Sequence, residues 1–195
     1  MFTVVLDACT LVPITLCDTL LRIAETGSFG VRWSATILGE VERTMVGKLG
    51  VSAEAAARRV QAMDRAFRFA EVRDHERFEH LLTNAPKDRH VLACAITAQV
   101  HTIVTFNLKD FSPSSLEPWG VEAVHPDQFL LDQLDLAPGH VTHAVHTMVE
   151  SSSRPPRTVD SVLGALARSG VPDFADELRR HITVSYTHLT LPTKA

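Results

Sequence analysis

Short apolar runs and longer stretches with helical periodicity alternate along most of the chain. Residues 2–8 and 101–107 are rich in apolar β-formers but too short for helices, so they predict buried strands. Residues 14–27, 34–50 and 84–100 carry apolar side chains at helical spacing and predict helices. Hydrophobic strands that alternate with helices are typical of a parallel sheet covered on both faces. The pattern therefore predicts an α/β fold.

Weaker segments of the same two kinds fill the gaps between these elements. Further short strands are predicted at residues 29–34, 69–72 and 121–124. Further helices are predicted at residues 52–69, 73–82 and 126–134.

The pattern changes late in the chain and divides it into three predicted parts. Residues 1–134 form the α/β domain. Residues 135–182 are helical in character, with a break at two adjacent prolines, and predict a C-terminal extension of two or three helices. Residues 183–195 have no coherent apolar face and resemble a translated vector sequence, so we expect a non-native or disordered tail outside the fold.

The charge balance limits the kinds of partner. The chain has 195 residues and a formal net charge of −4. A protein that binds phosphate backbones usually presents a basic face, so contact with nucleic acid would need a local basic patch on this mildly acidic chain.

The cysteines and the N-terminus favour a cytoplasmic protein. The chain has three cysteines and no CxxC pair, so we expect reduced thiols, with Cys9 and Cys94 at small core positions. Met1 leads into the first strand without the basic segment of a secretory signal. Residues 91–108 lack Asp, Glu, Lys and Arg, but polar residues interrupt them, and we expect a buried helix and strand rather than a membrane span.

Four acidic residues stand beside the predicted buried elements: Asp7, Glu40, Asp88 and Asp110. Asp7 and Asp110 follow strands, and ligands of open parallel sheets bind beyond the carboxyl ends of the strands. Glu40 lies along the apolar face of a helix, and Asp88 lies in the first turn of another. Each also has an ordinary interpretation as a turn residue, a helix cap or a solvated side chain. If the four converge, their mutual repulsion favours a bound cation, and hard oxygen ligands suit Mg²⁺ or Mn²⁺.

Four segments follow one another in a characteristic order: VVLDACTLVP, SATILGEVERTM, PKDRHVLACAITAQVHTIVTFNLKDF and EPWGVEAVHPDQFL. In this order and spacing they resemble a PIN-domain nuclease, and more closely a VapC-type toxin with a helical C-terminal extension. The resemblance covers roughly residues 1–133, and the later segment TVDSVLGALARSGVPDFADELR resembles the extension found in one branch of the family. It implies a PIN-like α/β/α sandwich with a central, mostly parallel sheet.

The resemblance also implies an activity and a set of partners. The implied protein is a metal-dependent endoribonuclease whose acidic quartet, Asp7, Glu40, Asp88 and Asp110, holds Mg²⁺ or Mn²⁺ and activates a water. The implied partners are an RNA substrate, a second copy of the chain in a homodimer, and a cognate antitoxin that inserts an arginine into the acidic groove.

Neighbouring polar residues would support the quartet. Many members of the family carry an acid where this chain has Asn107, which leaves open whether Asn107 or Asp110 lies nearer the metal. Thr10 and Thr105 would orient a carboxylate through their hydroxyl groups.

Basic residues near these acids are candidates for contact with RNA phosphates: Arg58, Arg59, Lys87, Arg89 and Lys109. The alternative for the arginine-rich segment is an ordinary solvated helix face.

Two other functional classes stay open. An aspartyl-phosphate phosphatase or a receiver domain also places an aspartate after its first strand, although a haloacid-dehalogenase-type phosphatase would need a second aspartate where Cys9 stands. A degenerate PIN fold would serve as a non-catalytic RNA-binding module. We expect His140, His143 and His146 at the surface or core edge rather than on zinc, and His90 at the surface.

Overall fold

A computed structural model of the chain describes residues 2–151 and 157–189, with side chains as far as residue 183. Its residues cluster into two compact units. The sheet unit comprises Met1–Cys17 and Phe29–Pro126, and the helical unit comprises Asp18–Ser28 and Asp127–Ala195. The boundary predicted between residues 134 and 135 therefore falls inside the helical unit, which also takes in a segment from the start of the chain.

Four short strands form one sheet in the sheet unit: β1 (Thr3–Leu6), β2 (Gly30–Arg32), β3 (Thr102–Val104) and β4 (Glu122–Val124). The strand order is β2-β1-β3-β4, and all neighbours are parallel. Val5 of β1 lies opposite Ile103 of β3, and both are fully buried. Burial on both faces explains the continuous apolar run of the central strand β1, whereas the edge strands β2 and β4 are less buried and carry Arg32 and Glu122. The predicted parallel α/β fold is confirmed.

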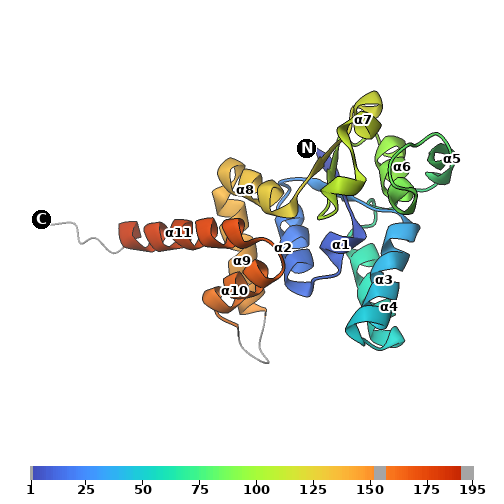
Figure 1. Ribbon diagram of the computed structural model, residues 1–195. Helices are drawn as coiled ribbons and strands as arrows, with labels where there is room; N and C mark the ends of the chain where they lie inside the picture. Colours follow the sequence, from blue (N-terminus) through green and yellow to red (C-terminus); the bar gives the residue numbers. More distant parts are fainter. Residues whose placement is uncertain (1, 152–156, 190–195) are drawn as a thin grey trace, which may run out of the picture. The chain divides into compact units, whose positions relative to one another are not determined.

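The helices of the sheet unit are labelled in Figure 1; the three longest lie within predicted helical segments, whereas the four-residue helices are shorter than predicted or were not predicted. They are α1 (Ala8–Leu11), α3 (Ala35–Leu49), α4 (Ala53–Ala66), α5 (Glu76–Glu79), α6 (Arg89–Thr97) and α7 (Pro113–Leu116). Short 3₁₀ helices stand at η1 (Pro86–Asp88), η2 (Leu108–Asp110) and η3 (Glu117–Trp119). Helix α6 packs on β1 and β3, and α3 packs on α1, α4 and α6.

Local signals in the sequence fix the ends of α3, the helix that matters most for the site. The Ser34 hydroxyl accepts a hydrogen bond from the Ile37 N–H, which satisfies one free donor of the first turn. Gly50 ends the helix with φ of 66°, a left-handed conformation that glycine adopts without a steric penalty. Ile37, Val41 and Met45 bury one face of the helix, so the remaining faces are left for other contacts.

Two predicted elements differ from the structure. Residues 69–72 were expected to form a strand, but in the described part of the chain they contribute only an isolated bridge between Trp33 and Glu71. One bridge at the sheet margin offers too few hydrogen bonds to extend a strand. The helix expected at residues 73–82 is limited to α5, and Asp74, with φ of 59°, interrupts it before its first turn.

The helical unit contains α8 (Pro126–Leu136), α9 (Pro138–Glu150), α10 (Val159–Arg168) and α11 (Pro172–Leu189), and α2 (Ile14–Glu25) enters it from the sheet unit. Helix α10 packs against α9 and α11. The buried Asp127 carboxylate accepts hydrogen bonds from the N–H groups of Asp173 and Phe174, which caps the start of α11. The backbone of α11 stays helical through residue 189, beyond the predicted start of the tail, and residues 190–195 lie outside the described residues.

The helices bear on two further predictions, one about the three histidines and one about a membrane span. His140 and His143 are exposed on α9 and His146 is half-buried there, as expected for side chains at a helix surface. In the described ranges, no helix combines the length and the apolar character needed to span a membrane.

Candidate functional site

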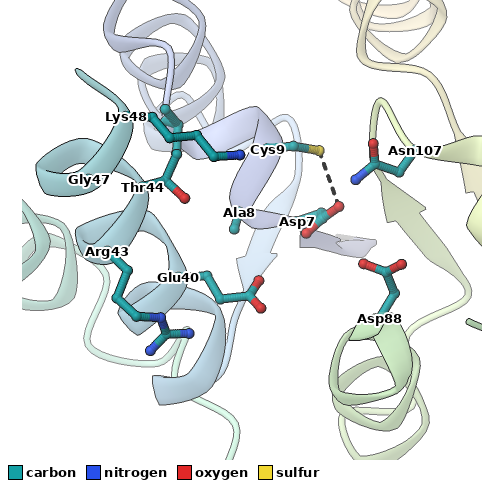
Figure 2. A pocket seen from close by; sticks show the side chains of 11 residues that line it. Asp7, Ala8, Cys9, Glu40, Arg43, Thr44, Gly47, Lys48, Asp88 and Asn107 are labelled. Carbon is teal, nitrogen blue, oxygen red and sulfur yellow. Dashed lines mark hydrogen bonds between the residues drawn. The ribbon is translucent and has the colours of Figure 1, made fainter. Parts of the chain in front are cut away.

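One pocket of the sheet unit gathers polar side chains that are far apart in the sequence. It has a volume of about 740 Å³, and Asp7, Glu40, Asp88 and Asn107 line it (Figure 2). Asp7 follows β1, Glu40 lies on α3, Asp88 ends η1 at the start of α6, and Asn107 follows β3. Three of the four predicted acids therefore share one pocket at the carboxyl edge of the sheet, together with the asparagine.

The position of Asp7 is fixed by both its main chain and its side chain. Its N–H donates to the Val104 carbonyl oxygen at 3.1 Å, which extends the pairing of β1 with β3 by one residue. Its buried carboxylate accepts a hydrogen bond of 2.6 Å from the Thr105 hydroxyl and one of 3.1 Å from the Cys9 thiol. The contact predicted for Thr105 is thus present.

Two residues beside Asp7 act differently from the sequence prediction. The Thr10 hydroxyl donates to the main-chain oxygen of Asp7 at 2.8 Å and not to its carboxylate, so it supports the first turn of α1. Cys9 is more than a small packing residue, because it bonds the carboxylate directly. Burial, with the nearby charge of Asp7, raises the pKa of the Cys9 thiol to about 12, so the thiol stays protonated and remains a donor.

Asp88 carries an unsatisfied carboxylate oxygen. Its Oδ2 is buried and has no hydrogen-bond partner, and Lys87 Nζ stands at ion-pair distance, 3.5 Å away. Burial raises the pKa of Asp88, and the charges of Asp7 and Asp110 raise it further against the opposing effect of Lys87. A buried anion with too few hydrogen-bond donors is costly, so a further cation beside this oxygen would stabilise the pocket.

Glu40 is paired with a histidine that was expected at the surface. His90 is buried on α6, and its Nε2 lies 3.3 Å from Glu40 Oε2. The contact with His90 lowers the pKa of Glu40 despite partial burial, and Arg43 and Lys87 lower it further. Burial opposes the imidazolium form of His90, but Glu40 outweighs it and the pKa of His90 is raised. The pair joins α3 to α6 across one side of the pocket.

Asp110 lies beside the pocket and not among the residues that line it. Its carboxylate is held by Lys87, whose Nζ is 2.7 Å from Asp110 Oδ2. The same ammonium group faces Asp88, so Lys87 links the two acids. Asn107, the departure from the family pattern, lines the pocket where Asp110 does not.

The predicted basic residues separate into different groups in the structure. Arg59 is half-buried and donates to the carbonyl oxygens of Leu11 and Val12, at 2.6 and 2.9 Å, so it holds the end of α1. Arg89 donates weakly to the Asn84 carbonyl oxygen at 3.4 Å. Arg58 and Lys109 are exposed and do not line the pocket.

Two cations that line the pocket were missed from the sequence. Arg43 and Lys48 stand on α3, together with Thr44 and Gly47, on the wall that carries Glu40 (Figure 2). Their spacing of three, four, seven and eight residues from Glu40 places them on one side of a helix, which is a signal that the sequence does contain.

The pocket offers oxygen atoms of the kind that divalent cations bind. Among the residues with described side chains, no three His, Cys, Asp or Glu groups stand close enough to enclose an ion on their own. The atoms available as metal ligands are nevertheless carboxylate and amide oxygens, including Asp88 Oδ2, which has no hydrogen-bond partner. Mg²⁺ commonly binds through one or two carboxylates and retains several waters, and Mn²⁺ has the same preference for oxygen ligands.

Comparison with known proteins gives two matches to family models. Residues 3–109 match a model described as "PIN domain", and residues 126–180 match a model described as "VapC50 C-terminal domain". Over 99 residues the chain is 46% identical to a protein of Mycobacterium tuberculosis (strain ATCC 25618 / H37Rv) named "Putative ribonuclease VapC50". The match covers 51% of this chain and 58% of that protein, so the chain spans little more than half of its relative. No solved structure matches.

Proposed function

The chain belongs to the PIN-domain family, as a VapC-type member with a helical C-terminal extension, and from this premise we propose that it is an Mg²⁺- or Mn²⁺-dependent endoribonuclease. The observation that carries the proposal is the unsatisfied Asp88 Oδ2 in a pocket shared with Asp7 and Glu40. A site without a cation would gain nothing from bringing these carboxylates together, because their repulsion opposes folding.

In this proposal Asp7, Glu40, Asp88 and Asn107 hold the cation. Asp110 lies beside the pocket and is linked to Asp88 through Lys87. A bound divalent ion would supply a Lewis acid for the phosphodiester and lower the pKa of water. It would also reverse the local electrostatics, so that an acidic pocket accepts a polyanion.

The residues around the acids would position them for this task. Thr105 and Cys9 fix the orientation of the Asp7 carboxylate through two hydrogen bonds. His90 holds Glu40 from the α6 side, and Lys87 holds Asp110 beside Asp88. Such outer contacts keep ligands within the narrow range of orientations that metal binding requires.

We extend the proposal to the biological setting of VapC-type proteins. The chain would act in the cytoplasm as the toxin of a toxin–antitoxin pair, with RNA as its substrate and a homodimer as its assembly. A small antitoxin would occupy the acidic pocket, with an arginine that offsets the carboxylate charge. Growth arrest on expression, relieved by a short reading frame adjacent to this one, would support that setting.

The direct test is metal-dependent cleavage of RNA by the purified chain. We expect cleavage with Mn²⁺ that EDTA abolishes and that Asp7→Asn and Asp88→Asn both remove. The matched control is Asp64→Asn, an exposed acid on α4 outside the pocket, which should cleave normally. Cleavage retained in Asp7→Asn would point to a contaminant and refute the proposal.

A second readout separates a nuclease from a non-catalytic RNA-binding module. Mn²⁺ should raise the melting temperature of the parent protein and of Asp64→Asn but not of Asp88→Asn. A parent protein that binds RNA without a Mn²⁺-induced shift would favour the binding module.

A further inference from the structure

The cations around the acidic pocket differ in whether another group already engages them. Lys87 is paired with Asp110, and Arg59 is bonded to the carbonyl groups at the end of α1. Arg43 and Lys48 line the pocket, and within the described residues neither makes a hydrogen bond or an ion pair, although the charge of Arg43 acts on Glu40. These two side chains therefore keep their donors available to a ligand in the pocket.

The two cations stand on the wall of the pocket that α3 forms. Glu40, Arg43, Thr44 and Lys48 are carried by α3, and Figure 2 shows them across from Asp88 and Asn107. The α3 wall thus carries two cations besides the Glu40 carboxylate, and the carboxylates of Asp7 and Asp88 belong to other elements.

Gly47 interrupts this wall at a position where the fold does not require glycine. It lies inside α3 with ordinary helical geometry, and a Cβ atom built there would meet nothing within 4 Å. Glycine in a helix interior costs about 0.5–1 kcal/mol relative to alanine. Its absent side chain leaves the helix backbone open to the pocket between Arg43 and Lys48.

We propose that this wall of α3, made of Arg43, Thr44, Gly47 and Lys48, is the track along which one RNA strand passes the acidic site. The inference rests on the proposed function and adds the binding path of the substrate. Arg43 and Lys48 would each contact a phosphate, the Thr44 hydroxyl would donate to a phosphate or ribose oxygen, and Gly47 would let the backbone of the strand approach the helix.

Contacts of this kind carry no base identity, so the track would hold RNA strands of any sequence in register with the acids. Its signature is the salt dependence of binding, because each neutralised phosphate of a single strand adds about −0.7 to the slope of log K against log salt.

The test is binding of a fluorescein-labelled single-stranded RNA, followed by anisotropy at several salt concentrations in an Asp7→Asn background that does not cleave. We expect Lys48→Gln and Arg43→Gln each to reduce the magnitude of the salt slope by about 0.7. The control Arg180→Gln, an exposed cation on α11, should leave the slope unchanged.

Gly47 gives a second test that a merely structural role would not pass. Gly47→Ala should raise the melting temperature, as alanine does in a helix, and should weaken RNA binding several-fold. Gly164→Ala, in the interior of α10 and outside the pocket, should raise the melting temperature and leave RNA binding unchanged.

The outcomes distinguish this inference from the proposed function. Unchanged salt slopes in Lys48→Gln and Arg43→Gln, with normal affinity in Gly47→Ala, would overturn the track while metal-dependent cleavage by the parent still stood. Failure of the parent to cleave or bind RNA at low salt would overturn both.

Discussion

The Thr105 hydroxyl donates a hydrogen bond of 2.6 Å to the carboxylate of Asp7, although 98 residues separate them in sequence. The two residues directly follow the paired strands β3 and β1. The parallel register therefore sets the distance between hydroxyl and carboxylate. The same hydroxyl accepts the Asn107 N–H at 3.0 Å, so one side chain positions both a carboxylate and the loop that follows β3.

Replacing this hydroxyl by a methyl group should weaken the site. Thr105→Val keeps the shape of the side chain but removes a donor to the Asp7 carboxylate, and loss of such an outer contact typically costs about 10- to 100-fold in metal affinity or activity. Cleavage rates and Mn²⁺ titrations measure the effect. Thr105→Ser should retain function. Thr97→Val is the control, because the buried Thr97 hydroxyl has no hydrogen-bond partner among the described residues.

Removing the charge of Asp88 should stabilise the protein and abolish its function. Burial raises the pKa of Asp88, so ionising it costs stability progressively as pH rises above its ordinary value of 3.8. Asp88→Asn should therefore have a higher melting temperature than the parent at neutral pH without divalent cations. Most substitutions lower stability by about 0.5–3 kcal/mol, so an increase is diagnostic.

Thermal unfolding of Asp88→Asn over a pH series provides the measurement for this prediction. The advantage over the parent should shrink toward acid pH, and Mn²⁺ should remove it by stabilising only the parent. A variant less stable than the parent at every pH would contradict the assigned electrostatics.

The Glu40–His90 pair predicts a defined pH window of stabilisation. The pKa of His90 is raised, so its contribution is complete below the ordinary value of 6.5 and is lost as pH rises through the folded pKa. The pKa of Glu40 is lowered, so its contribution is present above 4.5 and is lost as pH falls through the folded pKa. The pair should therefore stabilise the protein most between these two limits.

Urea unfolding of His90→Gln at pH 5.5, 7 and 8.5 tests this window. The stability difference from the parent should be largest at pH 5.5 and smallest at pH 8.5. His80→Gln, at an exposed histidine, is the control for the loss of an imidazole side chain. A difference for His90→Gln that grows with pH would reverse the sign and exclude the ion pair.

Arg59 should affect stability and not RNA binding. Its guanidinium donates to the Leu11 and Val12 carbonyl groups, and hydrogen bonds from charged donors contribute about 1.5–3 kcal/mol. Arg59→Met should lower the free energy of unfolding by about 2 kcal/mol, whereas the exposed Arg58→Met should change it by less than about 0.5 kcal/mol. Denaturant midpoints measure both values. A reduced salt slope of RNA binding in Arg59→Met would instead show that Arg59 contacts RNA.

The alternation of strand and helix was predictable from the sequence because it depends on local periodicity. Val4, Val5 and Ile103 are buried on both faces of the sheet, and such strands are recognisable as continuous apolar runs. The end of the first apolar run placed Asp7 after a strand, and helical spacing of apolar residues placed a helix at residues 34–50. The prediction of a strand at residues 69–72 was wrong, because a strand needs a neighbouring strand to pair with and the local sequence does not specify one.

The contacts within the site were decided by the tertiary structure. Nothing near His90 in sequence indicates that Glu40, fifty residues earlier, is its partner. Arg59 and Lys48 are alike as cations in the sequence, yet one is bonded to main-chain carbonyl groups and the other lines the pocket. Periodicity fixes which face of an element is buried, but side-chain pairing depends on packing between elements, and only the folded chain sets that.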